Sequence, residues 1–268
     1  MIRHLSYSSV NTYLYCAKSW EFRYIIKPDV PVSVNLPFGS AVHETVQTYV
    51  AARALHPDQV RPLAEIWHPT WRDVLNEQKR EIRWEKPLDY YTQLGERMLS
   101  TPEIVQAVDA IQPMIVVDTI ATKPEESVIM ERRVTLKVPG VPIPVIGYID
   151  MLASDGVPID FKTAGRAWSR GKEDTEVQPD FYLAALNQEG YDLNPGLAFR
   201  YMIFTKTKNP KVQILETHRD FGQLFWMTQV VGEVWRAIEA GIFPPAPTSW
   251  KCSPKYCSFW DLCRGKKL

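Results

Sequence analysis

Long hydrophobic runs are absent from this 268-residue chain, since no stretch approaches the roughly 20 apolar residues of a membrane-spanning helix. The first ten residues lack the basic-then-apolar order of a signal peptide. Internal repeats and low-complexity segments are also missing. With 45% hydrophobic residues, the chain is neither disordered nor collagen-like. We therefore expect a soluble intracellular, cytoplasmic protein with a sizeable core.

An excess of one charge is also lacking, because 31 Lys and Arg residues balance 31 Asp and Glu residues. Any contact with nucleic acid must then come from local basic patches rather than from a globally basic chain. Aromatic residues, in contrast, make up 12% of the chain. Most should lie in the core, and the remainder leave rings available for stacking on bases.

Cysteine is scarce, with four residues in the whole chain, which is too few for a disulfide scaffold. Cys252, Cys257 and Cys263 fall within twelve residues of a Pro- and Trp-rich tail, and Cys16 lies far away near the start. Four thiolates with none left over suit either an iron–sulfur cluster or a structural zinc ion. The spacing alone does not choose between these two metals.

Hydrophobic periodicity predicts helices first and a sheet afterwards. Ser8 or Ser9 is the expected N-cap of a helix that runs to about residue 25 and carries Cys16, and a second helix with His43 follows the segment 38–40. Residues 62–121 are mainly helical in pattern. Beyond them we predict strands at 128–138, 144–153, 157–163, 197–205 and 212–217, a turn at 154–156, and helices at 176–188 and 221–240.

Carboxylates and a lysine coincide on two of the predicted strands. Asp150 ends one strand, and Asp160 and Lys162 share a face of the next because side chains in a strand alternate with a period of two. Across a hairpin the two carboxylates can converge on one Mg²⁺ or Mn²⁺ ion. Such a cation polarises a phosphate and acidifies a water, so the pattern indicates phosphodiester cleavage.

Four motifs in a fixed order carry a family resemblance. They are Gly39-x-x-x-His43-Glu44, Gly147-x-x-Asp150, Asp160-Phe161-Lys162-Thr163 and Gln178-x-x-x-Tyr182. Together they resemble the PD-(D/E)XK nuclease superfamily and, within it, the RecB-like branch. The resemblance implies an α/β fold with a restriction-endonuclease-like core, in which helices flank a central mixed sheet.

The resemblance also implies roles for individual residues. His43, Asp150, Asp160 and the carbonyl of Phe161 are the implied metal ligands, and Lys162 is the implied catalytic residue beside the two aspartates. Gln178 and Tyr182 are implied to orient the lysine or the nucleic-acid backbone. Glu131, on the polar face of the preceding strand, is a further candidate.

The cysteines resemble those of AddB-type and CRISPR-associated members of this branch, in which one cysteine on the first helix and three near the C-terminus enclose a [4Fe–4S] cluster. The segment from Ser6 to Cys16 is also similar. Two departures, Ala17 in place of proline and the four residues between Cys252 and Cys257, keep zinc as the alternative. The expected organisation is a single domain, residues 1–268, with a helical insertion at about 55–125, a nuclease core at about 126–240 and a tail, 243–268, that a metal clasp joins to Cys16.

Basic residues interleaved with rings suggest where DNA would bind, since phosphates take charges and bases stack on rings. The candidates are Arg166, Trp168, Arg170, Arg200, Lys206 and Lys208. We expect a metal-dependent DNA exonuclease acting on single strands or duplex ends in recombination, repair or phage DNA processing, with recombination proteins as partners. An inactive DNA-end-binding scaffold and a restriction-type endonuclease remain the alternatives.

Overall fold

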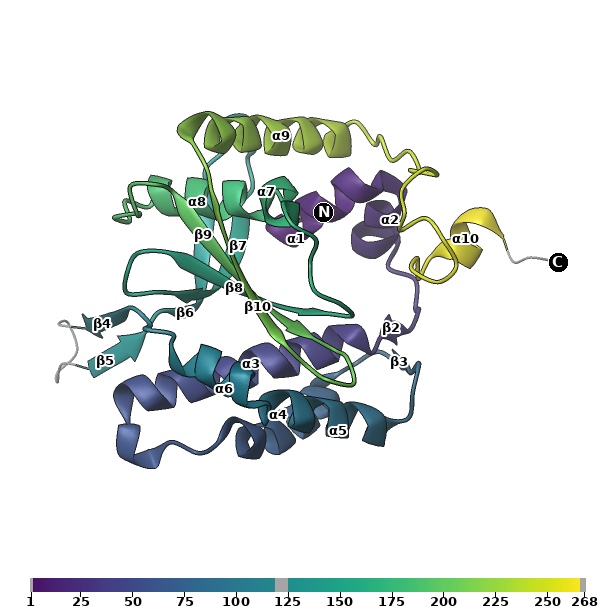
Figure 1. Ribbon diagram of the computed structural model, residues 1–268. Helices are drawn as coiled ribbons and strands as arrows, with labels where there is room; N and C mark the ends of the chain where they lie inside the picture. Colours follow the sequence, from purple (N-terminus) through teal and green to yellow (C-terminus); the bar gives the residue numbers. More distant parts are fainter. Residues whose placement is uncertain (1, 119–124, 266–268) are drawn as a thin grey trace.

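A central sheet with helices on both faces makes up the computed structural model, which describes residues 2–118 and 125–265 (Figure 1). The strands are β1 (Leu5–Ser6), β2 (Val32–Ser33), β3 (Ile82–Arg83), β4 (Ile115–Asp118), β5 (Glu125–Val128), β6 (Met130–Leu136), β7 (Val145–Leu152), β8 (Pro158–Ala164), β9 (Ala198–Thr205) and β10 (Val212–His218). The α-helices are α1 (Tyr7–Tyr15), α2 (Ala17–Glu21), α3 (Asn35–Leu55), α4 (Leu63–Glu77), α5 (Leu88–Leu99), α6 (Pro102–Asp109), α7 (Lys172–Thr175), α8 (Gln178–Gln188), α9 (Phe221–Glu239) and α10 (Trp260–Arg264), with a π-helix at Phe22–Ile26 and a 3₁₀ turn at Pro57–Gln59.

The large sheet is mixed, as predicted. Its strands follow the order β1-β7-β8-β9-β10, and β6 pairs with the other edge of β7. The pairs β1–β7 and β8–β9 are parallel, whereas β6–β7, β7–β8 and β9–β10 are antiparallel. A parallel step from β8 to β9 needs a crossover, and α7 and α8 supply it.

Strand β7 has two partners on one of its edges, at opposite ends. β1 pairs with it at Val145 and Ile146, and β8 pairs with it at Met151 and Leu152. Between these two short ladders, at residues 147–150, none of the described strands pairs with that edge. The sheet therefore opens in the middle, and Asp150 lies at the border of the opening.

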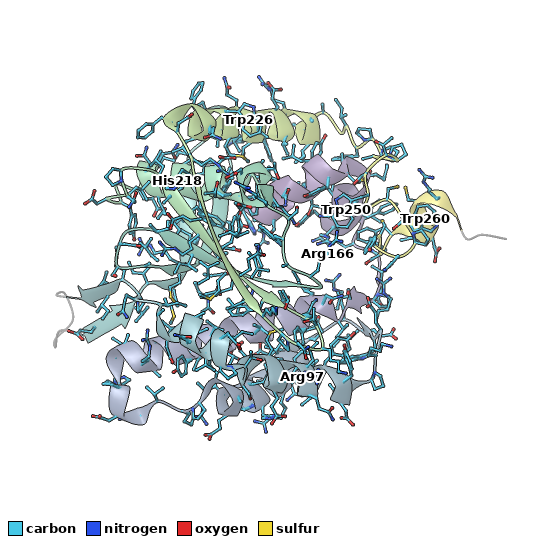
Figure 2. All side chains as sticks on the ribbon, viewed as in Figure 1. Arg97, Arg166, His218, Trp226, Trp250 and Trp260 are labelled. Carbon is cyan, nitrogen blue, oxygen red and sulfur yellow. The ribbon has the colours of Figure 1, made fainter. Side chains whose placement is uncertain are left out.

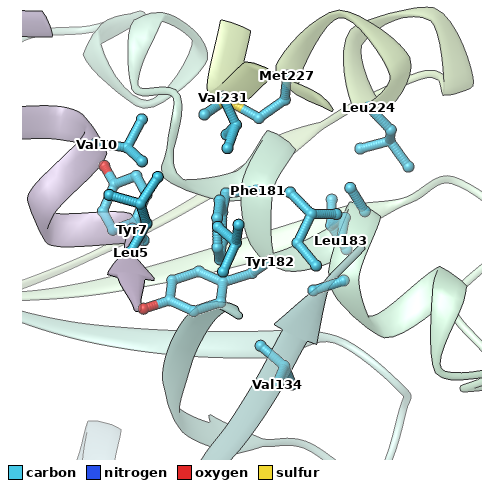
Figure 3. Packing of buried hydrophobic residues seen from close by; sticks show 14 of the residues in the cluster. Leu5, Tyr7, Val10, Val134, Phe181, Tyr182, Leu183, Leu224, Met227 and Val231 are labelled. Atoms are coloured by element: carbon cyan, nitrogen blue, oxygen red, sulfur yellow. The ribbon is translucent and has the colours of Figure 1, made fainter. Parts of the chain in front are cut away.

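Two hydrophobic cores lie on the two faces of the sheet. One contains residues of α1, α8 and α9, and Figure 3 shows Phe181 and Leu183 of α8 packed toward Leu224 and Met227 of α9. The other contains residues of α3, α4, α5 and α6. In Figure 1 the first group of helices lies above the sheet and the second below it. Helix α8 therefore lies on one face of the sheet and α3 on the other, and both reach the open part of the sheet.

The strands from β6 to β10 and helices α8 and α9 confirm the predicted elements to within about two residues. The prediction of one uninterrupted first helix was wrong, because Cys16 is extended, with φ at −169°, and separates α1 from α2. The N-cap is Ser6 rather than Ser8 or Ser9. Its hydroxyl accepts from the Ser9 amide, and the Ser9 hydroxyl accepts from the Ser6 amide, which satisfies two amides that the helix leaves free.

The predicted helical stretch between residues 62 and 121 contains α4, α5 and α6, but also strand β3, which pairs with β2, and β4, which pairs with β5. Residues 38–40, expected before a helix, lie inside α3. Positions 119–124 of the predicted insertion and 266–268 of the predicted tail lie outside the described residues. No helix in the described part of the chain is long and apolar enough to cross a bilayer.

Candidate active site

Asp160 is held in the interior by the sheet and by α8. Its residue is 5% exposed, and the Gln178 amide from the first turn of α8 donates a hydrogen bond to Asp160 Oδ1. Lys162 Nζ lies 2.6 Å from Asp160 Oδ2, as expected for two residues on one face of β8. Asp160 Oδ2 is buried, and apart from this contact with Lys162 it has no hydrogen-bond partner among the described residues, so acceptor capacity is left on this oxygen.

Burial controls the protonation of Asp160. Desolvation raises its pKa from 3.8 to about 6, because the interior disfavours the charged form, and the neighbouring Asp150 carboxylate adds to the effect. Lys162 and, to a smaller extent, His43 act in the opposite direction. A carboxyl with a raised pKa and a lysine beside it is a frequent signature of a functional site.

Asp150 bridges the two sides of the opening in the sheet. Its Oδ2 accepts a hydrogen bond of 2.7 Å from the Phe161 amide of β8 and lies 3.3 Å from His43 Nδ1. His43 comes from α3 on the other face, where its ring meets that of Phe161 edge-on at 5.9 Å. The structure therefore brings together His43, Asp150, Asp160, Phe161 and Lys162, all of which the motifs nominate.

Gly147 and Tyr182 explain the spacing of two motifs. A Cβ atom at residue 147 would lie 2.6 Å from Tyr182 Cε1 and 2.9 Å from Phe181 Cε1, so glycine lets α8 pack closely against the open edge of β7. Burial raises the pKa of Tyr182 above its usual range, and hydrogen bonds with the Gln178 side chain and the Tyr148 backbone oppose that rise. Gln178 and Tyr182, one turn apart, thus face the aspartates together.

Gln47 is a residue of the site that the sequence motifs do not indicate. Its side-chain amide donates to Glu131 Oε1 at 3.0 Å and to the Asp150 backbone carbonyl at 2.9 Å. Glu131 is therefore linked through Gln47 to the backbone of Asp150, and its own backbone has φ at +46°. The one available signal was position, since residue 47 is one helical turn after His43 and shares its face.

The sequence comparison agrees with this geometry. Residues 4–264 match the family model described as the PD-(D/E)XK nuclease superfamily. The chain belongs to this superfamily. Among solved structures, a protein of Eubacterium rectale titled "Putative exonuclease" aligns with a TM-score of 0.59 at 13% identity, over 99% of this chain and 90% of that chain.

Another match is weaker. A structure titled SSO0001 aligns with a TM-score of 0.35 at 14% identity, over 97% of this chain and 98% of that chain, and this likeness is too low to bear on the fold. No curated protein matches the chain. The family therefore defines a nuclease with an α/β core, and DNA is the substrate that the superfamily implies.

Metal ligands are not yet arranged around one point in this PD-(D/E)XK nuclease. Among the described residues, no three His, Cys, Asp or Glu side chains are placed to hold a single ion. Asp150 Oδ2 faces the Phe161 amide and His43, and Asp160 Oδ2 faces Lys162. The donor set nevertheless fits a hard cation, because it consists of carboxylate oxygens and an imidazole and includes the buried Asp160 Oδ2, which has acceptor capacity beyond its contact with Lys162.

All four cysteines line one cavity of about 180 Å³ between the first helices and the tail. They are free thiols, and burial together with the nearby Cys16, Cys252 and Cys263 raises the pKa of Cys257. The cavity is also lined by the cationic side chains of Arg23, Lys251 and Arg264. The structure thus brings together residues that are 247 positions apart in the sequence.

The candidate DNA-binding residues separate into groups. Arg166, Trp168 and Lys206 line one cleft of about 1120 Å³, which we call the basic cleft. Arg200 instead pairs with Glu216 at 2.7 Å and Asp155 at 3.1 Å, which neutralises its charge. Lys208 lines a different surface hollow together with Arg97, and Arg170 is exposed. We therefore keep the first three as the candidates closest to a shared surface.

Proposed function

We propose that this nuclease is a metal-dependent DNA exonuclease that acts on single strands or duplex ends. The observation that carries the proposal is the convergence of Asp150, Asp160 and Lys162 with His43 where the sheet opens. A role in processing DNA ends during recombination or repair, or in a phage genome, and recombination proteins as partners, follow from the RecB-like motifs.

His43, the carboxylates of Asp150 and Asp160, and the Phe161 carbonyl would hold Mg²⁺ or Mn²⁺. When bound, the cation polarises the scissile phosphate and lowers the pKa of a bound water. Asp160 Oδ2, which is buried and contacts Lys162 at 2.6 Å, would be the oxygen that Asp160 offers to the cation. Glu131 is the additional carboxylate available on this side through its link to Gln47.

Lys162 is the residue that we assign to the chemistry of phosphodiester cleavage. Its ammonium would orient the attacking water or stabilise the charge that develops on the phosphate. Gln178 keeps Asp160 oriented through its hydrogen bond, and Tyr182 holds Gln178 in place from the same helix. These are positioning roles, since neither group needs to touch the reacting atoms.

For the four cysteines we propose a [4Fe–4S] cluster, with zinc as the alternative. A single zinc ion draws four thiolates around one point, whereas a cluster several atoms wide keeps them apart. Four thiols that line a common cavity are the number of ligands that either group needs, and the resemblance of the cysteine pattern to cluster-bearing members of the RecB-like branch favours the cluster. Surrounding cations such as Arg23 and Arg264 would offset the negative charge of thiolate ligands.

The decisive experiment is the degradation of end-labelled linear single-stranded DNA by anaerobically purified protein with Mg²⁺ or Mn²⁺. We expect wild type to release label and the variants Asp160→Ala and Lys162→Ala to lose at least about a hundredfold in rate. If all three proteins bind DNA without cleaving it, the result supports an inactive end-binding scaffold instead of an enzyme. Cleavage of closed circular duplex DNA would support an endonuclease instead of an exonuclease, since an exonuclease needs a DNA end.

A further inference from the structure

The basic cleft is built from segments that are far apart in the sequence. Lys86 precedes α5 and Tyr90 lies in its first turn, Arg166 lies in the loop after β8, and Trp250 and Lys255 come from the cysteine-bearing tail. Figure 2 shows Arg166 and Trp250 on the side of the molecule where the tail lies, away from Trp226 on α9. A hydrogen bond of 3.5 Å from Arg83 to the Lys255 carbonyl links the tail to β3.

The charge of the cleft differs from that of the chain. Its lining contains five Lys and Arg residues, Lys86, Arg166, Lys172, Lys206 and Lys255, against Glu85 alone. Lys172 is paired with Glu176 at 3.3 Å, and Lys206 donates to Asn35. Lys86, Arg166 and Lys255 form no ion pair with any residue that the structure describes. Three cations are therefore free to neutralise phosphates in a chain whose net charge is zero.

Large rings are exposed along the same cleft. The exposed fractions are 64% for Trp250, 54% for Tyr256 and 43% for Tyr90, although such residues usually bury most of their surface. Trp250 and Tyr256 lie 5.4 Å apart with ring planes at 75°. Exposed rings next to cations offer faces on which unpaired bases stack. A duplex hides its base faces within its own stack, so this surface suits a single strand.

The cleft leads to the candidate active site. Ala164 and Gly165 line it, and Lys162 lies two residues earlier on β8, which corresponds to about 7 Å along a strand. Asn35, the first residue of the helix that carries His43, lines it as well. A DNA strand lying in the cleft would therefore pass next to Lys162 and the two aspartates of the candidate active site.

We propose that the basic cleft binds single-stranded DNA in preference to duplex and guides it to the site, with the tail residues Trp250, Lys255 and Tyr256 forming one of its walls. The inference rests on the proposed function, because it names the substrate form of that same site. It does not depend on which metal the cysteines hold.

Binding is measured in an Asp160→Ala background, so that cleavage does not interfere, by fluorescence anisotropy of a labelled single strand and of a duplex of the same sequence. We expect the added pair Trp250→Ala and Tyr256→Ala to weaken single-strand binding about tenfold or more with little change in duplex binding. The added pair Lys86→Ala and Lys255→Ala should lower the slope of log affinity against log salt by about 1.4.

Matched controls are exposed residues away from the cleft. Phe225 and Trp226 on α9 are 64% and 48% exposed, and Phe225→Ala with Trp226→Ala, like Lys137→Ala, should leave affinity and salt slope unchanged. Because all these side chains are exposed, the variants should fold, which circular dichroism verifies.

Two results would overturn the inference. One is single-strand binding that survives both pairs of substitutions in the cleft, and the other is tighter binding of duplex than of single strand. A different result would contradict the proposed function. In that case the protein with an intact Asp160 binds single-stranded DNA through the cleft but releases no label with either cation. If the protein cleaves DNA but the cleft substitutions do not change single-strand binding, this inference is wrong and the proposed nuclease function still holds.

Discussion

The ring of Tyr182 occupies the space that a side chain at residue 147 would need. A Cβ atom built on Gly147 lies 2.6 Å from Tyr182 Cε1, well inside contact distance. The close approach of α8 to the open edge of β7 depends on this glycine, and the same helix carries Gln178, which holds Asp160. Two sequence motifs that are about thirty residues apart are therefore one packing unit.

Gly147→Ala should for this reason damage both stability and activity. Tyr182 and Phe181 must move to admit the methyl group, at a cost of about 1–3 kcal/mol in the free energy of unfolding. Nuclease activity should fall further than stability explains, because Gln178 moves with the helix. Urea unfolding and label release measure the two effects. Gly232→Ala is the control, since its Cβ meets Val138 at an ordinary 3.7 Å. A Gly147→Ala protein as active as wild type would contradict the packing argument.

Asp160 should make the metal-free protein less stable at neutral pH. Because its pKa is raised from 3.8 to about 6, the folded protein binds more protons than the unfolded chain between about pH 4 and pH 6. The stabilisation by this residue is therefore complete below about pH 4 and is lost as pH rises through 6. This difference between the folded and unfolded pKa values corresponds to about 3 kcal/mol in the free energy of unfolding. Asp160→Asn removes this loss and keeps an acceptor for Gln178.

In EDTA, the melting temperature of Asp160→Asn should therefore exceed that of wild type above pH 6, and the difference should shrink as pH falls toward 4. Adding Mn²⁺ should raise the melting temperature of wild type more than that of the variant, because the carboxylate is a proposed ligand. A difference that does not depend on pH, or a wild type more stable than the variant at pH 7 without metal, would show that burial does not control this group.

Gln47 should be needed to hold Asp150 and Glu131 together. Gln47→Leu is similar in size but leaves the Asp150 carbonyl and the Glu131 carboxylate without their donor, which should cost about 1–2 kcal/mol. Activity should fall at least tenfold because the strand end that carries Asp150 is no longer fixed. The matched control is Gln188→Leu, because the Gln188 side chain forms its hydrogen bonds with the Lys137 backbone, away from the site. Equal activities for the two variants would remove Gln47 from the site.

Arg219 should stabilise the fold outside the site. Its guanidinium, 2% exposed as a side chain, donates to Asp180 Oδ1 at 2.6 Å and to the Glu176 carbonyl at 2.8 Å, and so ties the segment before α8 to the end of β10. Arg219→Met leaves the Asp180 carboxylate buried and unpaired, at a cost of about 3–5 kcal/mol.

Adding Asp180→Leu should recover part of that loss, which the urea midpoints of the double-mutant cycle measure. Arg236→Met is the control, since Arg236 pairs with Glu233 on the exposed surface and should change stability by less than about 0.5 kcal/mol. A single variant as stable as this control would mean that the buried pair contributes nothing.

Much of the sheet could be predicted because its alternating residues encode one buried face. Val134 and Leu136 of β6 alternate with polar neighbours, and β6 begins and ends within two residues of the prediction. Local pattern could not reveal the break at Cys16, because the flanking residues keep helical spacing on both sides of it. The four motifs located the aspartates and the lysine, since their order along the chain follows the order of the elements that meet at the site.

Residues brought together by distant segments were beyond prediction. Nothing near Tyr90 indicates that Trp250 lies across the same cleft, 160 positions later. Arg200 shows the opposite error, since a basic segment suggested a DNA contact, yet two carboxylates, one on the neighbouring strand, neutralise it. Charge pairing depends on tertiary contacts and therefore does not follow from local composition.

The four cysteines should stabilise the protein by linking the tail to the first helices. A cluster that joins Cys16 to Cys263 closes a loop of nearly the whole chain, and the loop-closure entropy of such a link amounts to about 5 kcal/mol. Cys257→Ser should therefore lose the visible absorption of an iron–sulfur cluster and lower the melting temperature by about 10 °C. Ser258→Ala, which changes a neighbour lining the same cavity, is the control. Iron, sulfide and zinc analysis of anaerobic protein decides between the two metals, and a Cys257→Ser protein with unchanged metal content and melting temperature would show that the four thiols hold no metal.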